Sequence, residues 1–568
     1  MENRHRNTTL LAATIALAAV SASAQPSNNA SPVGTNLWFF RDWVSEYSMV
    51  DAFKASRPWV PHCMDCRPVV WDTGESKQIE LDERGWVKSL PSPVSGARFT
   101  SVGTLMFTAI DGHYPAGQYV VLYEGEGTLN YGRDAVKRED LSSPGRDVLD
   151  VTPSAGGIWL TITSTDPAKT GNYLRNIRVI MPGFEESYRE QIFHPDLLEK
   201  LKPYRAIRYM QWAETNGSTQ SSWNTRTLPD DARWNIPGGA GVPVEILVVL
   251  SNRLSADPWI CMPHMAGDDY MASYAALVRD TLAPDLRVYV EFSNEVWNGS
   301  SGFNQSGYVQ RQGMEKWQNP SISPFTKQIN WHGMRTAQMC DIWKSVWGEQ
   351  SGRVLCVMGA QSGNPWTASQ SLDCPLWSEG APCYKHGIDI VAGGPYFGGY
   401  LGDPRFEEQV LAWTKDEDQG LAKLFEELLT GGVLSGGPPG GAMARAFQEM
   451  DDLTMIAADR GLGAAAYEGG SHFASLRSNA TVTDLFRAAS LDPRMGGVYD
   501  RYFAAWRDRG GQIFMHYFNV GNTTRLGSFG ALEYMDQSSS PKYDAILRFI
   551  GENPCWWANC ALPAPAAP

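Results

Sequence analysis

The sequence predicts an α/β protein: a (β/α)8 TIM barrel with a β-sandwich domain inserted after the first barrel strand. Three observations lead to this prediction. Short apolar runs of strand character alternate with segments of helical period over much of the 568 residues. Between residues 68 and 182 the pattern changes to closely spaced β-type runs separated by Gly, Pro and Asp. Glutamates end two of the apolar runs, where a barrel collects its functional groups.

The composition is that of an acidic globular chain. Hydrophobic residues make up 43% and charged residues 19%, which is typical of folded rather than disordered protein. The formal net charge of −14 argues against a nucleic acid partner. Because 568 residues exceed one ordinary core, a large barrel with an additional domain is favoured.

The N-terminus is typical of a secretory signal peptide. A basic stretch at residues 4–6 precedes an apolar run at 10–20, and small residues at 22–24 form a cleavage site. The apolar run is too short to remain as a membrane span. We therefore expect residues 1–24 to be removed and the protein to be secreted or periplasmic, with no integral membrane anchor.

Nine cysteines in an exported chain predict disulfides and at least one unpaired thiol. The candidate pairs are Cys374 with Cys383, Cys555 with Cys560, and Cys340 with Cys356. Cys63 and Cys66 have the spacing of a redox or zinc half-site, but no second half accompanies them, so a structural disulfide is favoured. Cys261 lies in an apolar run and is expected to be a buried free thiol.

The barrel is expected to occupy residues 33–67 and 183–553. Its strands are predicted at 34–40, 205–210, 258–264, 288–292, 353–359, 388–396, 463–468 and 512–518. The helices are predicted at 51–57, 195–201, 242–254, 268–282, 331–347, 444–460 and 542–550. The inserted sandwich is predicted at 68–182, with β-type runs at 97–110, 117–123, 157–163 and 173–181.

Three polar or low-complexity stretches are predicted to lack regular structure. The Gly-rich stretch 299–330 is expected to be a loop that forms one wall of the cleft, and 431–441 a flexible loop in the sixth crossover. The tail at 561–568 is rich in Ala and Pro and is expected to be disordered.

Two glutamates are the candidate catalytic residues. Glu295 follows the strand 288–292, and Glu468 follows the small, apolar run that begins at Gly463. A single strand-end carboxylate is more often a solvated or capping acid. Two of them supply what glycoside hydrolysis requires, namely a proton donor to the leaving oxygen and a partner facing the anomeric carbon.

These strand-end motifs resemble those of the clan A glycoside hydrolase superfamily, retaining (β/α)8-barrel enzymes that include family 5 cellulases and mannanases. The resemblance implies that Glu295 is the acid/base and Glu468 the nucleophile. It implies that Asn294 binds the sugar 2-hydroxyl and that Tyr396 orients the nucleophile. His264 matches a histidine that binds substrate or tunes the acid.

Arg208 lies inside a predicted strand, where a buried guanidinium needs a carboxylate partner. The period of two places Glu291 on the same face as Glu295, so we expect an ion pair between Arg208 and Glu291 below the site. The resemblance also implies that Arg208 reaches the nucleophile. Candidate sugar platforms, each weighed against a place in the core, are Trp297, Trp366 and Trp377.

The resemblance has two departures: the inserted domain, and Tyr-Phe-Asn at 517–519 where related enzymes commonly have Trp. The leading hypothesis is an exported retaining glycoside hydrolase that cleaves a β-glycan such as cellulose, without metal or cofactor. The alternative is a non-catalytic carbohydrate-binding protein on the same barrel. A structural envelope protein would explain none of the strand-end residues. The inserted sandwich fits either a carbohydrate-binding module or a structural wall.

Overall fold

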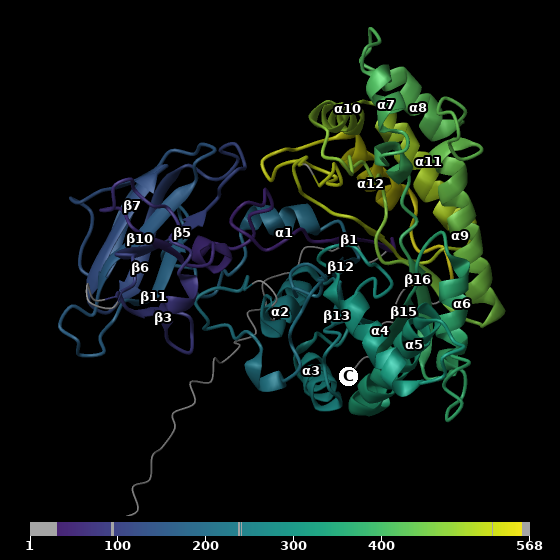
Figure 1. Ribbon diagram of the computed structural model, residues 1–568, viewed down its shortest axis with the longest axis horizontal. Helices are drawn as coiled ribbons and strands as arrows, with labels where there is room; N and C mark the ends of the chain where they lie inside the picture. Colours follow the sequence, from purple (N-terminus) through teal and green to yellow (C-terminus); the bar gives the residue numbers. More distant parts are fainter. Residues whose placement is uncertain are drawn as a thin grey trace, which may run out of the picture.

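The computed structural model describes residues 31–91, 96–236, 239, 241–524, 526–558 and 560. Eight parallel strands close into a barrel with helices around it (Figure 1). In spatial order they are β1 (Val33–Asn36), β12 (Ala206–Arg208), β13 (Asp257–Met262), β14 (Val288–Phe292), β15 (Val354–Gly359), β16 (Ile388–Gly393), β17 (Gly463–Ala466) and β18 (Phe514–His516). Pairing of Thr35 with His516 closes the ring, which confirms the predicted barrel.

The barrel strands are buried on both faces, which explains their nearly continuous apolar sequence. Every residue of β13 and β14 is buried. Inside the barrel, the rings of Trp259 and Tyr289 stack with centroids 5.1 Å apart and form part of a separate interior cluster. The barrel is therefore a packed core whose functional groups are at its rim.

Helices at the expected places are α1 (Pro195–Leu201), α2 (Val244–Leu254), α3 (Asp268–Thr281), α5 (Pro324–Trp347), α9 (Gly441–Asp459) and α12 (Pro541–Glu552). The sequence reading missed α4 (Asn304–Lys316), α6 (Pro365–Asp373), α7 (Glu407–Trp413), α8 (Leu421–Leu429), α10 (Ala480–Leu491) and α11 (Arg494–Asp508). Short 3-10 helices are η1 (Ala52–Ala55), η2 (Ser76–Gln78), η3 (Trp223–Thr225), η4 (Gly348–Arg353), η5 (Cys383–Lys385) and η6 (Gly399–Gly402). The helix expected at 51–57 is thus only the single turn η1.

The predicted loop at 299–330 is wrong, because it contains α4 and the start of α5. The buried face of α4 includes Gln305, Ser306 and Gly313, so its amphipathic pattern is hidden in a polar sequence. The Ser323 side chain accepts a hydrogen bond from the backbone N–H of Thr326, and Pro324 occupies the first position of α5. These residues form a regular helix N-terminus.

Two four-stranded antiparallel sheets are inserted between β1 and β12. One sheet has the order β2 (Val60–His62), β5 (Ser101–Met106), β10 (Ile158–Thr165), β7 (Gly127–Arg133). The other has the order β11 (Arg175–Ile180), β6 (Gly117–Glu124), β9 (Arg146–Val151), β8 (Ala135–Lys137), and β3 (Glu80–Leu81) pairs with β4 (Val87–Ser89). The first sheet already begins at Val60, ahead of the start expected at residue 68. The prediction missed β2 because it contains Pro61, which an edge strand tolerates.

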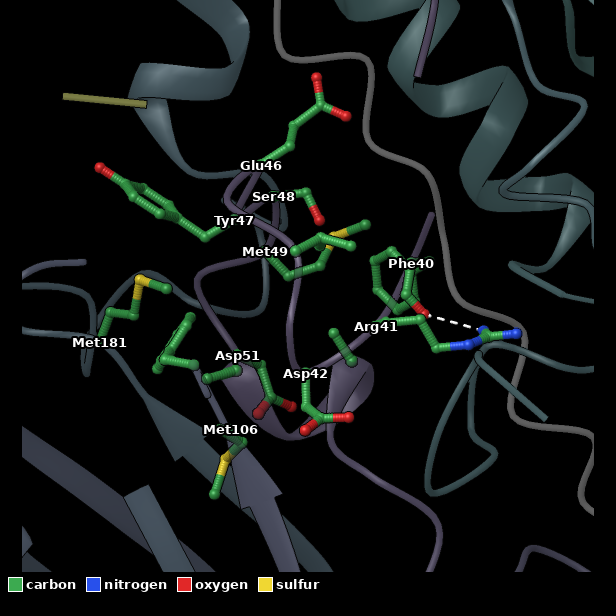
Figure 2. A pocket seen from close by; sticks show the side chains of 14 residues that line it. Phe40, Arg41, Asp42, Glu46, Tyr47, Ser48, Met49, Asp51, Met106 and Met181 are labelled. Carbon is green, nitrogen blue, oxygen red and sulfur yellow. Dashed lines mark hydrogen bonds between the residues drawn. The ribbon is translucent and has the colours of Figure 1, made fainter. Parts of the chain in front are cut away.

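The inserted sheets and the barrel share a hydrophobic core. Phe53, Val102 and Ile207 belong to the same cluster, although they come from the junction, the sheets and the barrel. Figure 2 shows a cavity at this junction, with Met106 and Met181 among its lining residues. Its volume of about 20 Å³ has room for roughly one water molecule, so it is too small for a sugar.

Three disulfides are present: Cys63–Cys66, Cys374–Cys383 and Cys555–Cys560. Cys261 is buried and free, as expected. Cys340 and Cys356 are also buried and free, so the third candidate pair is not bonded. In the described ranges, no helix is long and apolar enough to cross a membrane. The expected signal peptide and C-terminal tail lie outside the described residues.

Candidate active site

The two candidate catalytic glutamates lie at the same end of the barrel. Glu295 follows β14 and Glu468 follows β17, and Tyr396 follows β16, which pairs with β17. Because all eight strands are parallel, the residues just after them gather at the C-terminal mouth. The positions therefore match those that the sequence indicates.

The backbone around Glu295 has an uncommon conformation. Ser293 has φ of +61° and Glu295 has φ of +41°, in the left-handed region that non-glycine residues seldom adopt. Such residues cluster at functional sites because surrounding structure must hold them. Here the backbone N–H of Ser293 donates to Met262 O at 2.9 Å, and that of Asn298 donates to Glu295 O at 2.9 Å.

Arg208 connects the residues beneath the mouth. It is fully buried, and its Nε and Nη2 donate to Glu291 Oε2 at 3.1 and 2.8 Å, which is the expected ion pair. Its Nη1 donates to Glu468 Oε2 at 3.3 Å and to Asn36 Oδ1 at 3.1 Å. The remaining Nη2 proton goes to Asn294 Oδ1 at 2.9 Å. All five guanidinium donors are therefore used.

Glu468 is buried, with its side chain 7% exposed. Burial, which acts most strongly, together with the charges of Glu295 and Glu291 raises the pKa of Glu468 to about 8 against the opposing effects of Arg208 and a hydrogen bond from Tyr396. Tyr396 is part of an aromatic wall, with its ring 6.0 Å from that of Tyr517 in an edge-on contact. The two groups that favour ionised Glu468 are thus a guanidinium and a phenol.

Glu295 is half-buried and has different partners. Asn298 Nδ2 donates to its Oε2 at 2.9 Å, and the Tyr467 hydroxyl donates to its Oε1 at 3.2 Å. Burial raises the pKa of Glu295, and these two hydrogen bonds oppose the rise. No guanidinium of the described residues contacts Glu295, although the charge of Arg208 also lowers its pKa.

The side-chain amide of Asn294 connects Arg208 with Asn216. Its carbonyl accepts from Arg208, and its Nδ2 donates to Asn216 Oδ1 at 3.0 Å. Gln305 Nε2 donates both to Asn216 Oδ1 at 2.7 Å and to the backbone carbonyl of Asn294 at 2.8 Å. The orientation of the Asn294 amide is therefore fixed by the protein.

The other candidates have different surroundings. His264 is buried against Tyr308, with ring centroids 5.2 Å apart, and its Nδ1 has no hydrogen-bond partner in the described part of the chain. Burial lowers its pKa to about 4. Trp297 is half-buried, contacts His332 edge-on and packs against the core. The ring partners of Trp366 and Trp377 are Phe325 and His386, respectively.

Sequence reasoning missed several contributors to the site. Tyr467 reaches Glu295, and Asn36 Nδ2 donates to Tyr467 O at 3.1 Å. Gln211 Nε2 donates to the Tyr517 hydroxyl at 3.2 Å, and the peptide bond after Tyr517 is cis. The sequence could have indicated Asn36, because it is a polar residue at the C-terminal end of β1. Among the described residues, no group of three His, Cys, Asp or Glu could hold a metal ion.

No protein-family model matches the chain, and no curated protein sequence is significantly similar to it. Several solved structures are weakly similar to part of the chain. A GH5-4 broad specificity endoglucanase from Clostridium acetobutylicum is 10% identical with a TM-score of 0.34, over 62% of this chain and 88% of that one. A Bacteroidetes-affiliated GH5 cellulase is 13% identical with a TM-score of 0.34, over 65% and 87%.

A psychrophilic family 10 endo-β-1,4-xylanase is 9% identical with a TM-score of 0.31, over 62% of this chain and 92% of that one. Identities and TM-scores this low carry no conclusion about family or activity. Any functional conclusion has to come from the residues of the site.

Proposed function

We propose that this protein is an exported retaining glycoside hydrolase that cleaves a β-linked polysaccharide or oligosaccharide by double displacement. The observation that carries the proposal is the difference in hydrogen-bond partners between two carboxyls at one barrel mouth, one buried and one half-buried. Arg208 contacts Glu468, whereas Glu295 receives only neutral donors. Pairs of carboxyls in contrasting environments are how glycosidases separate an acid from a nucleophile.

The two carboxyls influence each other and titrate as a pair. Burial raises both pKa values, which favours one proton on the pair near neutral pH. The guanidinium of Arg208 stabilises negative charge on Glu468, so we place the charge there and the proton on Glu295. This assigns Glu468 as the nucleophile and Glu295 as the acid.

In the first step, a carboxylate oxygen of Glu468 attacks the anomeric carbon while Glu295 gives its proton to the glycosidic oxygen. The bond between the anomeric carbon and that oxygen breaks, and a covalent glycosyl-enzyme forms. In the second step, Glu295 takes a proton from water, which attacks the anomeric carbon and releases Glu468. The sugar keeps its β-configuration.

The neighbours of the pair have supporting roles in this proposal. Tyr396 orients Glu468 through its hydroxyl. Asn294 is the chain neighbour of Glu295 and accepts a hydrogen bond from Arg208, and we assign to it the contact with the sugar 2-hydroxyl. We infer export from the signal-type N-terminus and the three disulfides, and a cellulose or β-glucan type of substrate from the strand-end motifs.

Reducing-sugar release from a panel of β-glycans tests the proposal, with Glu468→Gln as the inactive control. We expect release from at least one β-glucan by the unaltered protein and at least a thousandfold less from the variant. Binding of insoluble polysaccharide without any release would instead favour the non-catalytic carbohydrate-binding alternative.

A further inference from the structure

A second polar hollow lies on the inserted domain, outside the barrel mouth. It is an open groove of about 500 Å³. Its wall includes side chains from β6 and β11, the β3–β4 turn, and the segment that leads from β11 back to the barrel. A volume of this size is in the range of small-ligand sites, roughly 300–1,000 Å³.

The lining of the groove is rich in arginine although the chain is acidic. Three arginines line it, namely Arg84, Arg178 and Arg189, against the two carboxylates of Glu124 and Asp230. Among the lining side chains the arginines exceed the carboxylates by one, and two of the arginines also pair with Asp51 and Asp231, which lie outside the lining. This favours an anionic ligand.

The three arginines differ in whether a carboxylate of the protein already pairs with the guanidinium group. Arg178 Nη1 lies 3.2 Å from Asp51 Oδ2, and Arg84 Nη1 lies 3.3 Å from Asp231 Oδ1. Arg189 is exposed and forms no ion pair with a carboxylate of the described residues. Among the three arginines, Arg189 is therefore the one whose guanidinium has no carboxylate partner in the described part of the chain.

The Tyr188 ring contacts two of these arginines. Its ring lies 5.7 Å from the Arg178 guanidinium carbon and 5.4 Å from that of Arg189. Cation–π attraction of this kind offsets the repulsion between two neighbouring guanidinium groups. Tyr123 also lines the groove. The backbone of Gly145 forms a hydrogen bond with the Tyr123 hydroxyl, whereas the Tyr188 hydroxyl has no hydrogen-bond partner in the described ranges.

A β-bulge shapes the same wall. The register of β11 against β6 shifts between Arg175 and Arg178, and Asn176 has φ of +53°. Asn176 Nδ2 donates to Glu124 Oε1 at 3.0 Å, and Arg175 lies 3.6 Å from the other oxygen of Glu124. Residues of the bulge thus bind the carboxylate of Glu124 on β6, so the arginines of the groove remain accessible to an anion.

We propose that this groove binds a carboxylated sugar residue of an acidic glycan. Arg189 supplies a planar fork for the carboxylate, and Arg178, which contacts the same Tyr188 ring, adds positive charge nearby. Tyr123 and Tyr188 provide ring surface and hydroxyls for the sugar. The preference for an anion follows from the groove itself, whereas the choice of a sugar carboxylate rests on the proposed glycosidase function.

The test uses the full-length protein and glucuronic acid, which has no glycosidic bond to cut. Binding is measured by calorimetry or ligand-observed NMR at low salt, beside glucuronamide and inorganic phosphate. We expect glucuronic acid to bind at least tenfold more tightly than either, and its affinity to fall as salt is added. Arg189→Gln should reduce the affinity at least tenfold, with partial recovery in Arg189→Lys. The matched control Arg133→Gln, an exposed arginine that stacks on Trp71 elsewhere on the sheets, should leave it unchanged.

Equal binding of glucuronamide, or unchanged affinity in Arg189→Gln with its circular dichroism intact, would overturn the proposal. Phosphate binding as tightly as glucuronic acid would show a simple anion site and would also overturn it. None of these results depends on turnover. If the protein binds glucuronic acid through Arg189 but cuts no β-glycan, the proposal for the groove stands and the proposed glycosidase function fails.

Discussion

The Tyr467 hydroxyl donates a hydrogen bond of 3.2 Å to Glu295, although Tyr467 is the chain neighbour of Glu468. Consecutive residues after β17 therefore serve opposite carboxyls of the proposed pair. Any shift of this turn would move the proposed nucleophile and the partner of the proposed acid together. A displacement of the turn would therefore affect both carboxyls, which also influence each other through their charges.

Replacement of Tyr467 by Phe should weaken acid catalysis without unfolding the protein. The Tyr467 hydrogen bond lowers the pKa of Glu295, so its loss should raise that pKa. The alkaline limb of kcat/KM against pH should move upward. Tyr209→Phe removes a hydroxyl that bonds Ser251 instead and should leave the profile in place. An unchanged profile in Tyr467→Phe would contradict this role.

Loss of Arg208 should destabilise the fold as well as the site. Arg208→Met leaves the buried carboxylates of Glu291 and Glu468 without their guanidinium, which should lower the free energy of unfolding by about 3–5 kcal/mol. The control Arg138→Met removes only exposed ion pairs and should destabilise the protein far less. Denaturant unfolding measures both, and equal costs would refute the central place given to Arg208.

The activity should follow a bell-shaped pH profile. The active form carries one proton on the pair, so a second proton inactivates the nucleophile at low pH and loss of the last proton removes the acid at high pH. Both limbs should lie above the ordinary glutamate value of 4.5, because burial raises the pKa of both carboxyls. Full activity at pH 10 would contradict the shared proton.

The inserted sheets should contribute to the stability of the whole chain. Asp51 Oδ1 accepts from the backbone N–H of Val179 at 2.9 Å, and its Oδ2 pairs with Arg178. Asp51→Ala leaves both donors unpaired and should lower the free energy of unfolding by about 1–3 kcal/mol in a single transition. Asp150→Ala on β9, whose carboxylate is more exposed, is the matched control and should change it little. Two separate transitions would indicate that the domains unfold independently.

The parts of the site that the sequence predicted depend on local periodicity. The period of two along β14 places Glu291 beneath Glu295, and an arginine inside a strand needs such a partner, so the ion pair was predictable. The contact of Tyr467 with Glu295 joins residues 172 positions apart and depends on the curvature of the closed barrel. No pattern in one strand encodes that distance.

The errors in the fold have similar causes. The helix α4 buries Gln305, Ser306 and Gly313, so its inner face lacks the apolar stripe from which a helix is read. Strand β2 contains Pro61, a residue that normally ends a strand prediction. In both cases tertiary contacts decide the structure over local preference.

Proton NMR of the first sugar released from a β-glycan tests the central claim most directly. Direct attack by Glu468 followed by attack of water inverts the anomeric centre twice, so the β-anomer should appear first and the α-anomer only later, by mutarotation. If the α-anomer appears first, a single displacement by water has occurred. Glu468 would then not be the nucleophile.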